Sequence, residues 1–395
     1  MKPKYRKKKM INLITACDEN YAKYLLPQIV SMNENIEDKV NFFFMYSRVS
    51  DETLHKLSIF CKEQKNIKFY PIKVNDGMEE FTELTQSGGG GGTGYSYFPF
   101  EVYFILQAHV YLPDWVERVL YFHSGDVLFW GDISDFYNFD FGGKNIIAES
   151  SNYKATDSEK NISLEEYYGK YGINSANFNS GTFMVNVKKM REEDYSLDFF
   201  LAIKKQIITF GESGRKKLWE GDQAFFSLAF LGNIQYFNAP LDKENRNKRS
   251  YNYSPVAKLW RAKLGQEEIK NPKIIHYDGK YKPWLFSKGT LESLNKSSIN
   301  EKNLNEGYHF FTPVNFKSYF NDYWDFVNKS PNFKEIFDEA VRSTSLFRNM
   351  VFPEIDRSIY AKRKVNDLRE EIKLKNSQLE MSNKKIDNIR QLLID

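Results

Sequence analysis

Four clusters of polar residues in this chain carry groups that could together bind a charged ligand. They are Asp18-Glu19-Asn20-Tyr21, His123-Ser124-Gly125-Asp126, Asp222-Gln223 and the segment from His276 to Lys282. Carboxylates and imidazoles bind divalent cations, a lysine and exposed backbone amides bind a pyrophosphate, and an aromatic ring can stack on a nucleobase. Together the clusters suit a nucleotide-diphosphate ligand, although each of them alone is a nonspecific signal.

Short apolar runs come directly before these clusters. Residues 10–17 end at Asp18, and residues 118–122 lead into His123, with a further apolar run at 127–130. Other strands are predicted at 40–46, 67–73, 145–148, 182–187, 233–237 and 273–277, and helices at 51–63 and 96–112. Leu25, Ile29 and Met32 at helical spacing predict a further helix directly after the Asp18–Tyr21 cluster. Alternating strands and helices predict a mostly parallel α/β sheet. Ligands of such a sheet bind beyond the carboxyl ends of its strands, which is where the clusters lie.

Composition narrows the class of protein. The chain has 395 residues, of which 41% are hydrophobic and 16% aromatic, which suits a large enzyme-sized domain with an appendage, or two domains. A formal net charge of only +4 argues against a nucleic-acid partner. Cys17 and Cys61 show no metal-ligand spacing, which favours a reducing compartment. No apolar run reaches the length of about 18 residues typical of a transmembrane helix, so we expect a cytoplasmic protein.

The two ends of the chain and a glycine run leave alternatives open. The N-terminal segment MKPKYRKKK is either a solvated tail or a peripheral contact with anionic lipid at the inner face of the membrane. From Val365, apolar residues on heptad positions, interrupted by Lys375 and Ser382, predict a coiled coil and hence a homo-oligomer, or an amphipathic helix. Gly88 to Gly92 lack a following Gly-Lys-Ser/Thr, so a surface loop or lid is favoured over a phosphate loop, and an engineered linker stays open.

The order of the clusters is more specific than the clusters themselves. The segments are ITACDENYAKYL at 14–25, ERVLYFHSGDVLFWGDI at 117–133, NFNSGTFMVNVKKMRE at 177–192, GDQAFFSLAF at 221–230 and KIIHYDGKYKPW at 273–284. In this order they resemble glycosyltransferase family 8, which includes glycogenin and bacterial lipopolysaccharide galactosyl- and glucosyltransferases.

The resemblance implies a GT-A fold: a Rossmann-like mixed sheet flanked by helices, with a C-terminal helical extension. It implies a catalytic domain over 10–290 and a helical tail over 291–360 that packs on it. The heptad pattern, which lies outside the family motifs, predicts an amphipathic or coiled-coil helix over 361–395. The implied activity is transfer of a hexose, glucose or galactose, from a UDP-sugar to a glycan acceptor with retention of anomeric configuration. The acceptor would be lipopolysaccharide, capsule or another cell-surface glycan.

The resemblance also assigns roles to matching residues. The uridine-binding loop corresponds to Ala16, Cys17, Asp18, Asn20 and Tyr21, with Tyr21 stacked on uracil, and the donor-sugar contacts correspond to Asn179 and Ser180. The pair that flanks the anomeric carbon corresponds to Asp222 and Gln223, where Gln223 would stabilise positive charge. The pyrophosphate loop corresponds to His276, Gly279 and Lys282. Two of these residues also have a purely structural interpretation. Asp222 is a candidate for a helix N-cap, and Tyr21 is a candidate for a residue that only packs in the core.

The chain departs from the family at the metal motif. Where the family has Asp-x-Asp, this chain has His-Ser-Gly-Asp, one residue longer, so either His123 or Ser124 takes the first ligand position and Asp126 the second. We predict that His123, Asp126 and His276 bind Mn²⁺ or Mg²⁺. A second departure is Ile105, where many members have an arginine that reaches the donor. The alternative is a catalytically weak nucleotide-sugar-binding or scaffold protein with a degenerate Asp-x-Asp site.

Overall fold

The computed structural model describes part of the chain. The described residues are 10–75, 78–81, 100–150, 178–193, 195–212, 221–237, 272–277, 323–343 and 375. The chain divides into two units, Met1–Ala340 and Val341–Asp395, and all of the sheet lies in the first. The basic N-terminal segment, the glycine run, Gly279, Lys282 and the heptad segment apart from Lys375 lie outside the described residues, so the expectations placed on them stay predictions.

A mixed sheet of seven strands forms the centre of the first unit, in the order β3-β2-β1-β4-β7-β6-β8. The strands are β1 Met10–Ala16, β2 Lys39–Tyr46, β3 Ile67–Lys73, β4 Val119–Phe122, β6 Ile146–Ser150, β7 Phe178–Val185 and β8 Ile234–Tyr236. Only β7 runs against its neighbours, because it pairs antiparallel with both β4 and β6 while the other pairs are parallel. The predicted mostly parallel α/β sheet is therefore confirmed.

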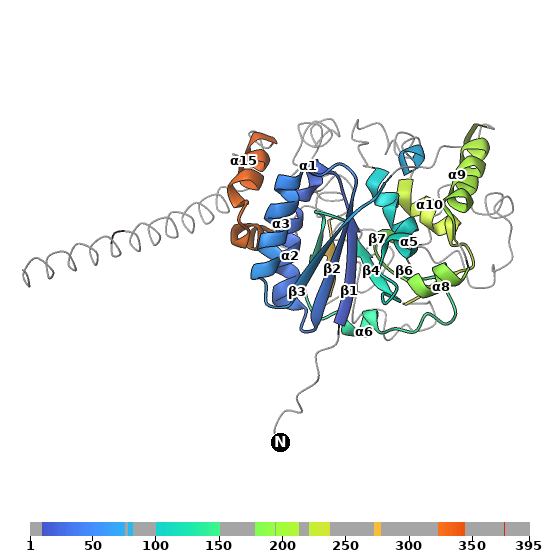
Figure 1. Cartoon of the computed structure of the whole chain (residues 1–395), viewed down its shortest axis with the longest axis horizontal. Coiled ribbons are helices and arrows are strands. Elements are labelled where there is room, and N and C mark those ends of the chain that lie inside the picture. Colours follow the sequence, from blue (N-terminus) through green and yellow to red (C-terminus); the bar gives the residue numbers. More distant parts are fainter. Residues whose placement is uncertain are drawn as a thin grey trace, which may run out of the picture. The chain divides into compact units, whose positions relative to one another are not determined.

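Helices cover both faces of this sheet (Figure 1). One face packs against α2 Leu25–Asn35 and α3 Asp51–Glu63. The other face packs against η2 Phe100–Gln107, α5 Ala108–Tyr111, α9 Leu197–Glu212 and α10 Gly221–Ala229. Further described helices are α1 Glu19–Ala22, η1 Met78–Phe81, α6 Ser134–Tyr137, α8 Val187–Glu192 and α15 Phe333–Ser343, and residues 323–329 are helical as well.

The continuous apolar run of β2 follows from this two-sided packing. Phe42 and Phe44 lie in the cluster beneath α2 and α3, whereas Phe43 and Met45 lie in the cluster on the opposite face. Successive side chains of a strand point to opposite faces, so a strand covered on both sides must be apolar throughout. Each of these fully buried side chains stabilises the fold by about 1.5–3 kcal/mol relative to an exposed one.

A second, two-stranded sheet lies beside the large one and joins two distant segments. Strand β5 Val127–Phe129 pairs antiparallel with β9 Ile274–His276, and Val127 lies opposite His276. The backbone N–H of Tyr277 donates to the carbonyl of Asp126 at 2.7 Å. This pairing brings together two of the polar clusters, although 150 residues separate Asp126 from His276 in the chain.

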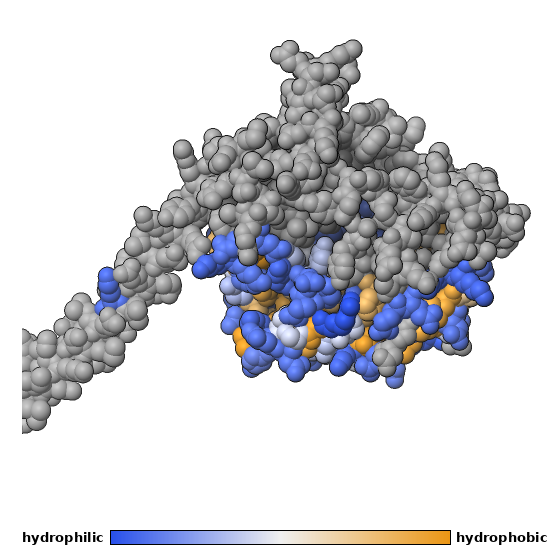
Figure 2. Space-filling model, turned by 90° about the horizontal axis from the view of Figure 1, so that it is seen from above, coloured by the Kyte–Doolittle hydropathy of each residue, from blue (hydrophilic) through white to orange (hydrophobic). Residues whose placement is uncertain are grey.

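The described part of the C-terminal tail packs against the N-terminal half of the unit. The Tyr323 ring is buried 5.6 Å from the ring of Tyr277, Lys329 pairs with Glu34 at 2.7 Å, and the Asn332 amide donates to the Lys23 carbonyl at 2.9 Å. Seen from above, the described surface is mostly hydrophilic, with hydrophobic residues in small separate patches (Figure 2). Among the described residues, no helix has the length and hydropathy needed to cross a bilayer.

The segment predicted to be helical at 96–112 differs in type from the expectation. Residues 100–107 form the 3₁₀ helix η2, and only 108–111 continue as an α-helix, while residues 96–99 lie outside the described part. Every residue of η2 is buried. Because this short apolar segment is buried throughout, its packing determines whether it forms a 3₁₀ or an α-helix. Helical spacing in the sequence could therefore not predict the 3₁₀ geometry.

Candidate active site

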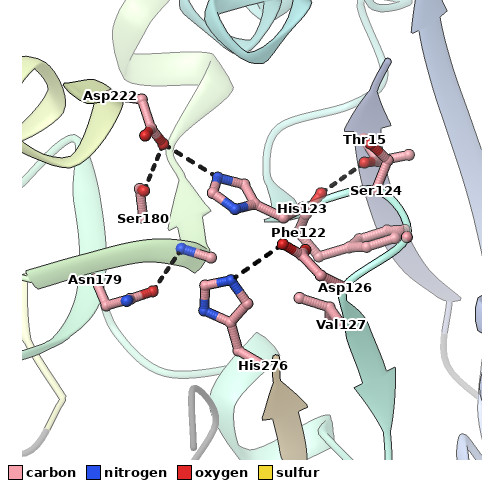
Figure 3. A network of polar contacts seen from close by, with 12 residues as sticks. Thr15, Phe122, His123, Ser124, Asp126, Val127, Asn179, Ser180, Asp222 and His276 are labelled. Carbon is pink, nitrogen blue, oxygen red and sulfur yellow. Dashed lines mark hydrogen bonds and ion pairs between the residues drawn. The ribbon is translucent and has the colours of Figure 1, made fainter. Parts of the chain in front are cut away.

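The predicted site residues meet at one edge of the sheet because of strand direction. Strands β1 and β4 run parallel, so the loops that follow Ala16 and Phe122 leave the sheet at the same edge. Strand β7 runs the opposite way, so its first residues, Phe178 to Ser180, lie at that edge as well. These two loops and the first residues of β7 meet at the site shown in Figure 3.

His123, Asp126 and His276 form a compact cluster of ligand groups. One ligand atom from each lies within 4.8 Å of the others, and the Nε2 atom of His276 is 3.7 Å from Oδ2 of Asp126. The two imidazole rings stand 5.3 Å apart at 84° (Figure 3). One carboxylate and two imidazoles form a donor set that suits a divalent transition-metal ion. The predicted ligands therefore fit such an ion.

The longer loop places His123, and not Ser124, beside the other two groups. The Ser124 hydroxyl instead donates to the carbonyl of Ala16 at 3.2 Å, and so fastens the loop to the end of β1. The hydroxyl of Thr15 donates to the Phe122 carbonyl at 2.6 Å and makes a second link between the two strand ends. Of the two alignments that the sequence left open, the geometry favours His123 at the first ligand position.

Gly181 leaves the space that the His276 ring occupies. A Cβ atom at position 181 would lie 2.1 Å from Nδ1 of His276, which is far inside van der Waals contact. That nitrogen is buried and has no hydrogen-bond partner among the described residues. On the Nδ1 side the ring is therefore held by shape, while its Nε2 faces Asp126. Gly181 lies within the motif at 177–192, but the sequence alone gives this glycine no role.

Asp222 links the metal-ligand cluster to helix α10. It lies in the first turn of that helix, and its Oδ2 atom accepts a hydrogen bond from Ser180 Oγ at 2.5 Å and lies 3.1 Å from Nε2 of His123 (Figure 3). Burial alone raises the pKa of the Asp222 carboxyl, but the hydrogen bond and charge of His123 and the hydrogen bond of Ser180 outweigh it, so the pKa lies below its usual value.

An ionised Asp222 fixes the tautomer of His123. A carboxylate can only accept, so Nε2 of His123 must carry the proton and donate it. In the neutral ring Nδ1 then carries the lone pair. Metal-binding histidines typically donate their second N–H to a carboxylate in this way, because the contact orients the ring. Gln223, the next residue along α10, is partly exposed.

The loop after β1 is shaped by its own side chains. Asp18 caps helix α1 by accepting from the backbone N–H of Tyr21 at 3.1 Å, and it also accepts from the Asn20 amide at 3.0 Å. Ala16 and Cys17 are buried. Burial, the largest effect, raises the pKa of the Cys17 thiol well above its usual value, so the thiol is a poor nucleophile at neutral pH.

The other predicted residues have different surroundings. The side-chain oxygen Oδ1 of Asn179 accepts from the backbone N–H of Gly181 at 2.9 Å, and Ser180 is fully buried beneath Asp222. The Tyr21 ring is partly buried, 5.9 Å from the Tyr24 ring. Ile105 is buried in the apolar cluster of η2, so the position where many family members have an arginine serves packing here.

Comparison with known proteins agrees with this geometry. The model of glycosyl transferase family 8 matches residues 12–288. The chain belongs to glycosyltransferase family 8. It is 22% identical over 279 residues to a Haemophilus influenzae protein that carries a glycosyltransferase name, an alignment that covers 69% of this chain and 73% of that protein. The family-8 chain is therefore a glycosyltransferase, as the order of its motifs implied.

Two solved structures share the fold of this family-8 chain. The galactosyltransferase LgtC, solved in complex with donor and acceptor sugar analogues, has a TM-score of 0.50 at 20% identity, and the match covers 75% of this chain and 99% of LgtC. The bifunctional glycosyltransferase WbbM has a TM-score of 0.50 at 16% identity, over 86% of this chain and 53% of WbbM. These matches confirm the GT-A fold.

Proposed function

We propose that this glycosyltransferase moves a hexose, glucose or galactose, from a UDP-sugar to a glycan acceptor, with retention of anomeric configuration. The observation that carries the proposal is the convergence of His123, Asp126 and His276 beside Asp222, at the sheet edge where the Asp18–Tyr21 loop begins. Lipopolysaccharide, capsule or another cell-surface glycan is the proposed acceptor, in keeping with the bacterial members that the sequence resembles.

Different segments would bind the two parts of the donor's UDP group. Asp18, Asn20 and Tyr21 would contact the uridine, and Gly279 and Lys282 would contact the diphosphate. His123, Asp126 and His276 would hold a divalent cation, Mn²⁺ or Mg²⁺, which supplies positive charge to the leaving diphosphate. Asp222 keeps His123 in the tautomer and orientation that this role requires.

The transfer itself needs little covalent chemistry from the protein. The bond between the anomeric carbon and the β-phosphate oxygen breaks, and the acceptor hydroxyl attacks the same face while its proton passes to that phosphate oxygen. Positive charge develops on the sugar ring, and the Gln223 amide oxygen would stabilise it from below. Lys282 would stabilise the negative charge that develops on UDP. Asn179 and Ser180 would position the donor sugar.

Release of UDP from a panel of UDP-sugars, with Mn²⁺ and with Mg²⁺, tests the proposal. We expect release from UDP-glucose or UDP-galactose, and we expect Gln223→Ala to lower it strongly. NMR of the product's anomeric proton would establish retention. Tight UDP binding without release from any donor would contradict the proposal and indicate a nucleotide-sugar-binding protein.

Two further proposals concern partners. The basic N-terminal segment would give a peripheral contact with anionic lipid, and the segment 361–395 would give a homo-oligomer through its heptads. Sedimentation of a chain that ends at Tyr360 tests the second, because an unchanged mass would remove it.

A further inference from the structure

The loop that carries the predicted metal ligands needs support from outside itself. Between His123 and Val127 the backbone turns at Gly125, whose φ of 82° lies in the left-handed region. The extra residue relative to Asp-x-Asp makes this loop longer. The N–H of His123 still donates to the Gly181 carbonyl of β7 at 2.9 Å, and the Asp126 carbonyl accepts from Tyr277 at 2.7 Å, but the bonds between them depart from a regular ladder. Buried main-chain groups need partners, so something must replace the missing ladder bonds.

One side chain, Gln28 of helix α2, provides these partners. Its Nε2 donates to the carbonyls of His123 and Val127, both at 2.8 Å, and its Oε1 accepts from the N–H of Gly125, also at 2.8 Å. Gln28 is completely buried. The amide orientation is unambiguous, because two carbonyls need a donor and one N–H needs an acceptor. Gln28 therefore connects both ends of the loop and its turn.

The same face of α2 continues the contact along β5. The Ser31 hydroxyl accepts from the N–H of Phe129 at 3.1 Å, and the Asn35 amide donates to the Phe129 carbonyl at 3.0 Å. Gln28, Ser31 and Asn35 follow helical spacing, so they form one polar row against one strand. Gln28 lies at the end of the row beside Asp126, and Asn35 lies at the opposite end.

We propose that Gln28 is a positioning residue for the cation site, an inference that rests on the metal-dependent function proposed above. By closing the loop, Gln28 sets the direction in which His123 and Asp126 leave it. Because β5 pairs with β9, the same contact sets the position of His276 relative to Asp126. The longer loop and the buried glutamine belong together: the glutamine supplies the bonds that the added residue requires.

The test compares Gln28→Met with Asn35→Ala. Methionine has nearly the shape of glutamine but makes no such hydrogen bonds, so the loop loses all three contacts. Asn35→Ala removes the same kind of bond from the same helix to the same strand, but at the end away from the site. Mn²⁺ alone, titrated and followed by the EPR signal of the free ion, gives the affinity, and urea unfolding gives the stability.

We expect Gln28→Met to weaken Mn²⁺ binding roughly 10- to 100-fold, as losses of outer-shell partners do. Asn35→Ala should lower the urea midpoint and leave Mn²⁺ affinity within about twofold. A folded Gln28→Met chain with wild-type affinity, or an equal loss of affinity in both variants, would overturn the inference. If Gln28→Met does not fold, Gly125→Ala provides a second test, because a side chain at this left-handed position strains the contact between Gly125 and Gln28. Unchanged Mn²⁺ affinity in Gly125→Ala would also overturn the inference.

The outcome also separates this inference from the proposed function. A wild-type chain that binds Mn²⁺ but releases UDP from no donor would overturn the proposed transfer, while the effect of Gln28→Met on affinity would still decide the role of Gln28. A wild-type chain that binds no Mn²⁺ would overturn both.

Discussion

Two loops leave the same edge of the sheet from neighbouring parallel strands, yet they are held in opposite ways. The loop after β1 is organised by Asp18, whose partners Tyr21 and Asn20 are three and two residues away. The loop after β4 is organised by Gln28, whose partners are 95, 97 and 99 residues away. The first loop takes its turn from a local cap and is linked to α3 at its surface through Glu19, whereas the turn of the second loop is set by a buried side chain from a distant helix.

This difference predicts how each loop responds to substitution. A change in the loop after β1 should cost stability and nucleotide contacts, and leave metal affinity nearly unaltered. A change in the loop after β4, or in the residues that surround it, should alter the metal site first. Substitutions in and around the two loops test this contrast.

Asp126→Asn should have the largest effect. It keeps the shape of the side chain but removes the one charged group among the three predicted metal ligands. Because a divalent cation strongly favours a carboxylate, we expect UDP release to fall on the order of 100-fold or more. Glu34→Gln, an exposed change on α2 that removes the pair with Lys329, is the control and should keep wild-type turnover. Equal turnover in both variants would contradict the metal role of Asp126.

Gly181→Ala should damage the site without touching a ligand. The new methyl group would overlap the His276 ring, so we expect roughly tenfold weaker Mn²⁺ binding or more and a loss of about 1–3 kcal/mol in the free energy of unfolding. The control is Gly143→Ala, where φ is +76° but no atom lies within 4 Å of the new Cβ. It should cost about 1–2 kcal/mol of stability and leave Mn²⁺ affinity alone. Wild-type affinity in Gly181→Ala would show that the ring is not held by shape.

Asp18→Ala should separate stability from metal binding. Loss of this N-cap should cost about 0.5–2 kcal/mol in the free energy of unfolding, measured in urea. Mn²⁺ affinity, measured without nucleotide, should stay near the wild-type value, because the cap acts within its own loop. A large fall in that affinity would mean that the two loops are coupled more tightly than their hydrogen bonds indicate.

Glu19→Gln should have a small effect that depends on pH. Glu19 fastens the loop after β1 to helix α3 by accepting from Ser50 and Thr53. Burial raises the pKa of Glu19, but these hydrogen bonds and the charge of Lys56 outweigh it, so the pKa lies below its usual value. A lowered pKa in the folded state stabilises the fold above the unfolded-state pKa of about 4.3, and this contribution disappears as pH falls through the folded-state pKa.

Urea midpoints of wild type and Glu19→Gln should therefore differ at pH 7, begin to converge below the unfolded-state pKa of about 4.3, and meet once pH has fallen through the lower folded-state pKa. A difference that stays constant down to acid pH would show that the carboxylate's charge plays no part in this contact.

Much of the fold could be predicted because it depends on local pattern. The apolar runs that end at Asp18 and His123 predicted β1 and β4, and Leu25, Ile29 and Met32 at helical spacing indicated α2. The predicted strand at 182–187 begins earlier in the structure, at Phe178. Asn179, Ser180 and Gly181 precede the predicted strand, whereas in the structure they belong to β7, at the strand end that faces the site.

The candidate site could be predicted only in part. Motif order located His123, Asp126, His276 and Asp222, but the choice between His123 and Ser124 stayed open, because the pattern alone does not determine how a longer loop turns. The role of Gln28 depends on contacts with residues almost a hundred positions away. Its one signal in the sequence is a polar side chain between Leu26 and Ile29, on a helix whose neighbouring positions are apolar.

The central claim, that two imidazoles and one carboxylate form the cation site of this transferase, is tested most directly by pulsed EPR of the Mn²⁺-loaded protein. Electron spin-echo modulation from ¹⁴N reports each imidazole bound to the ion. The account predicts coupling from two histidines in wild type and from one in both His123→Ala and His276→Ala. Coupling from a single histidine in wild type, unaltered by His123→Ala, would contradict it.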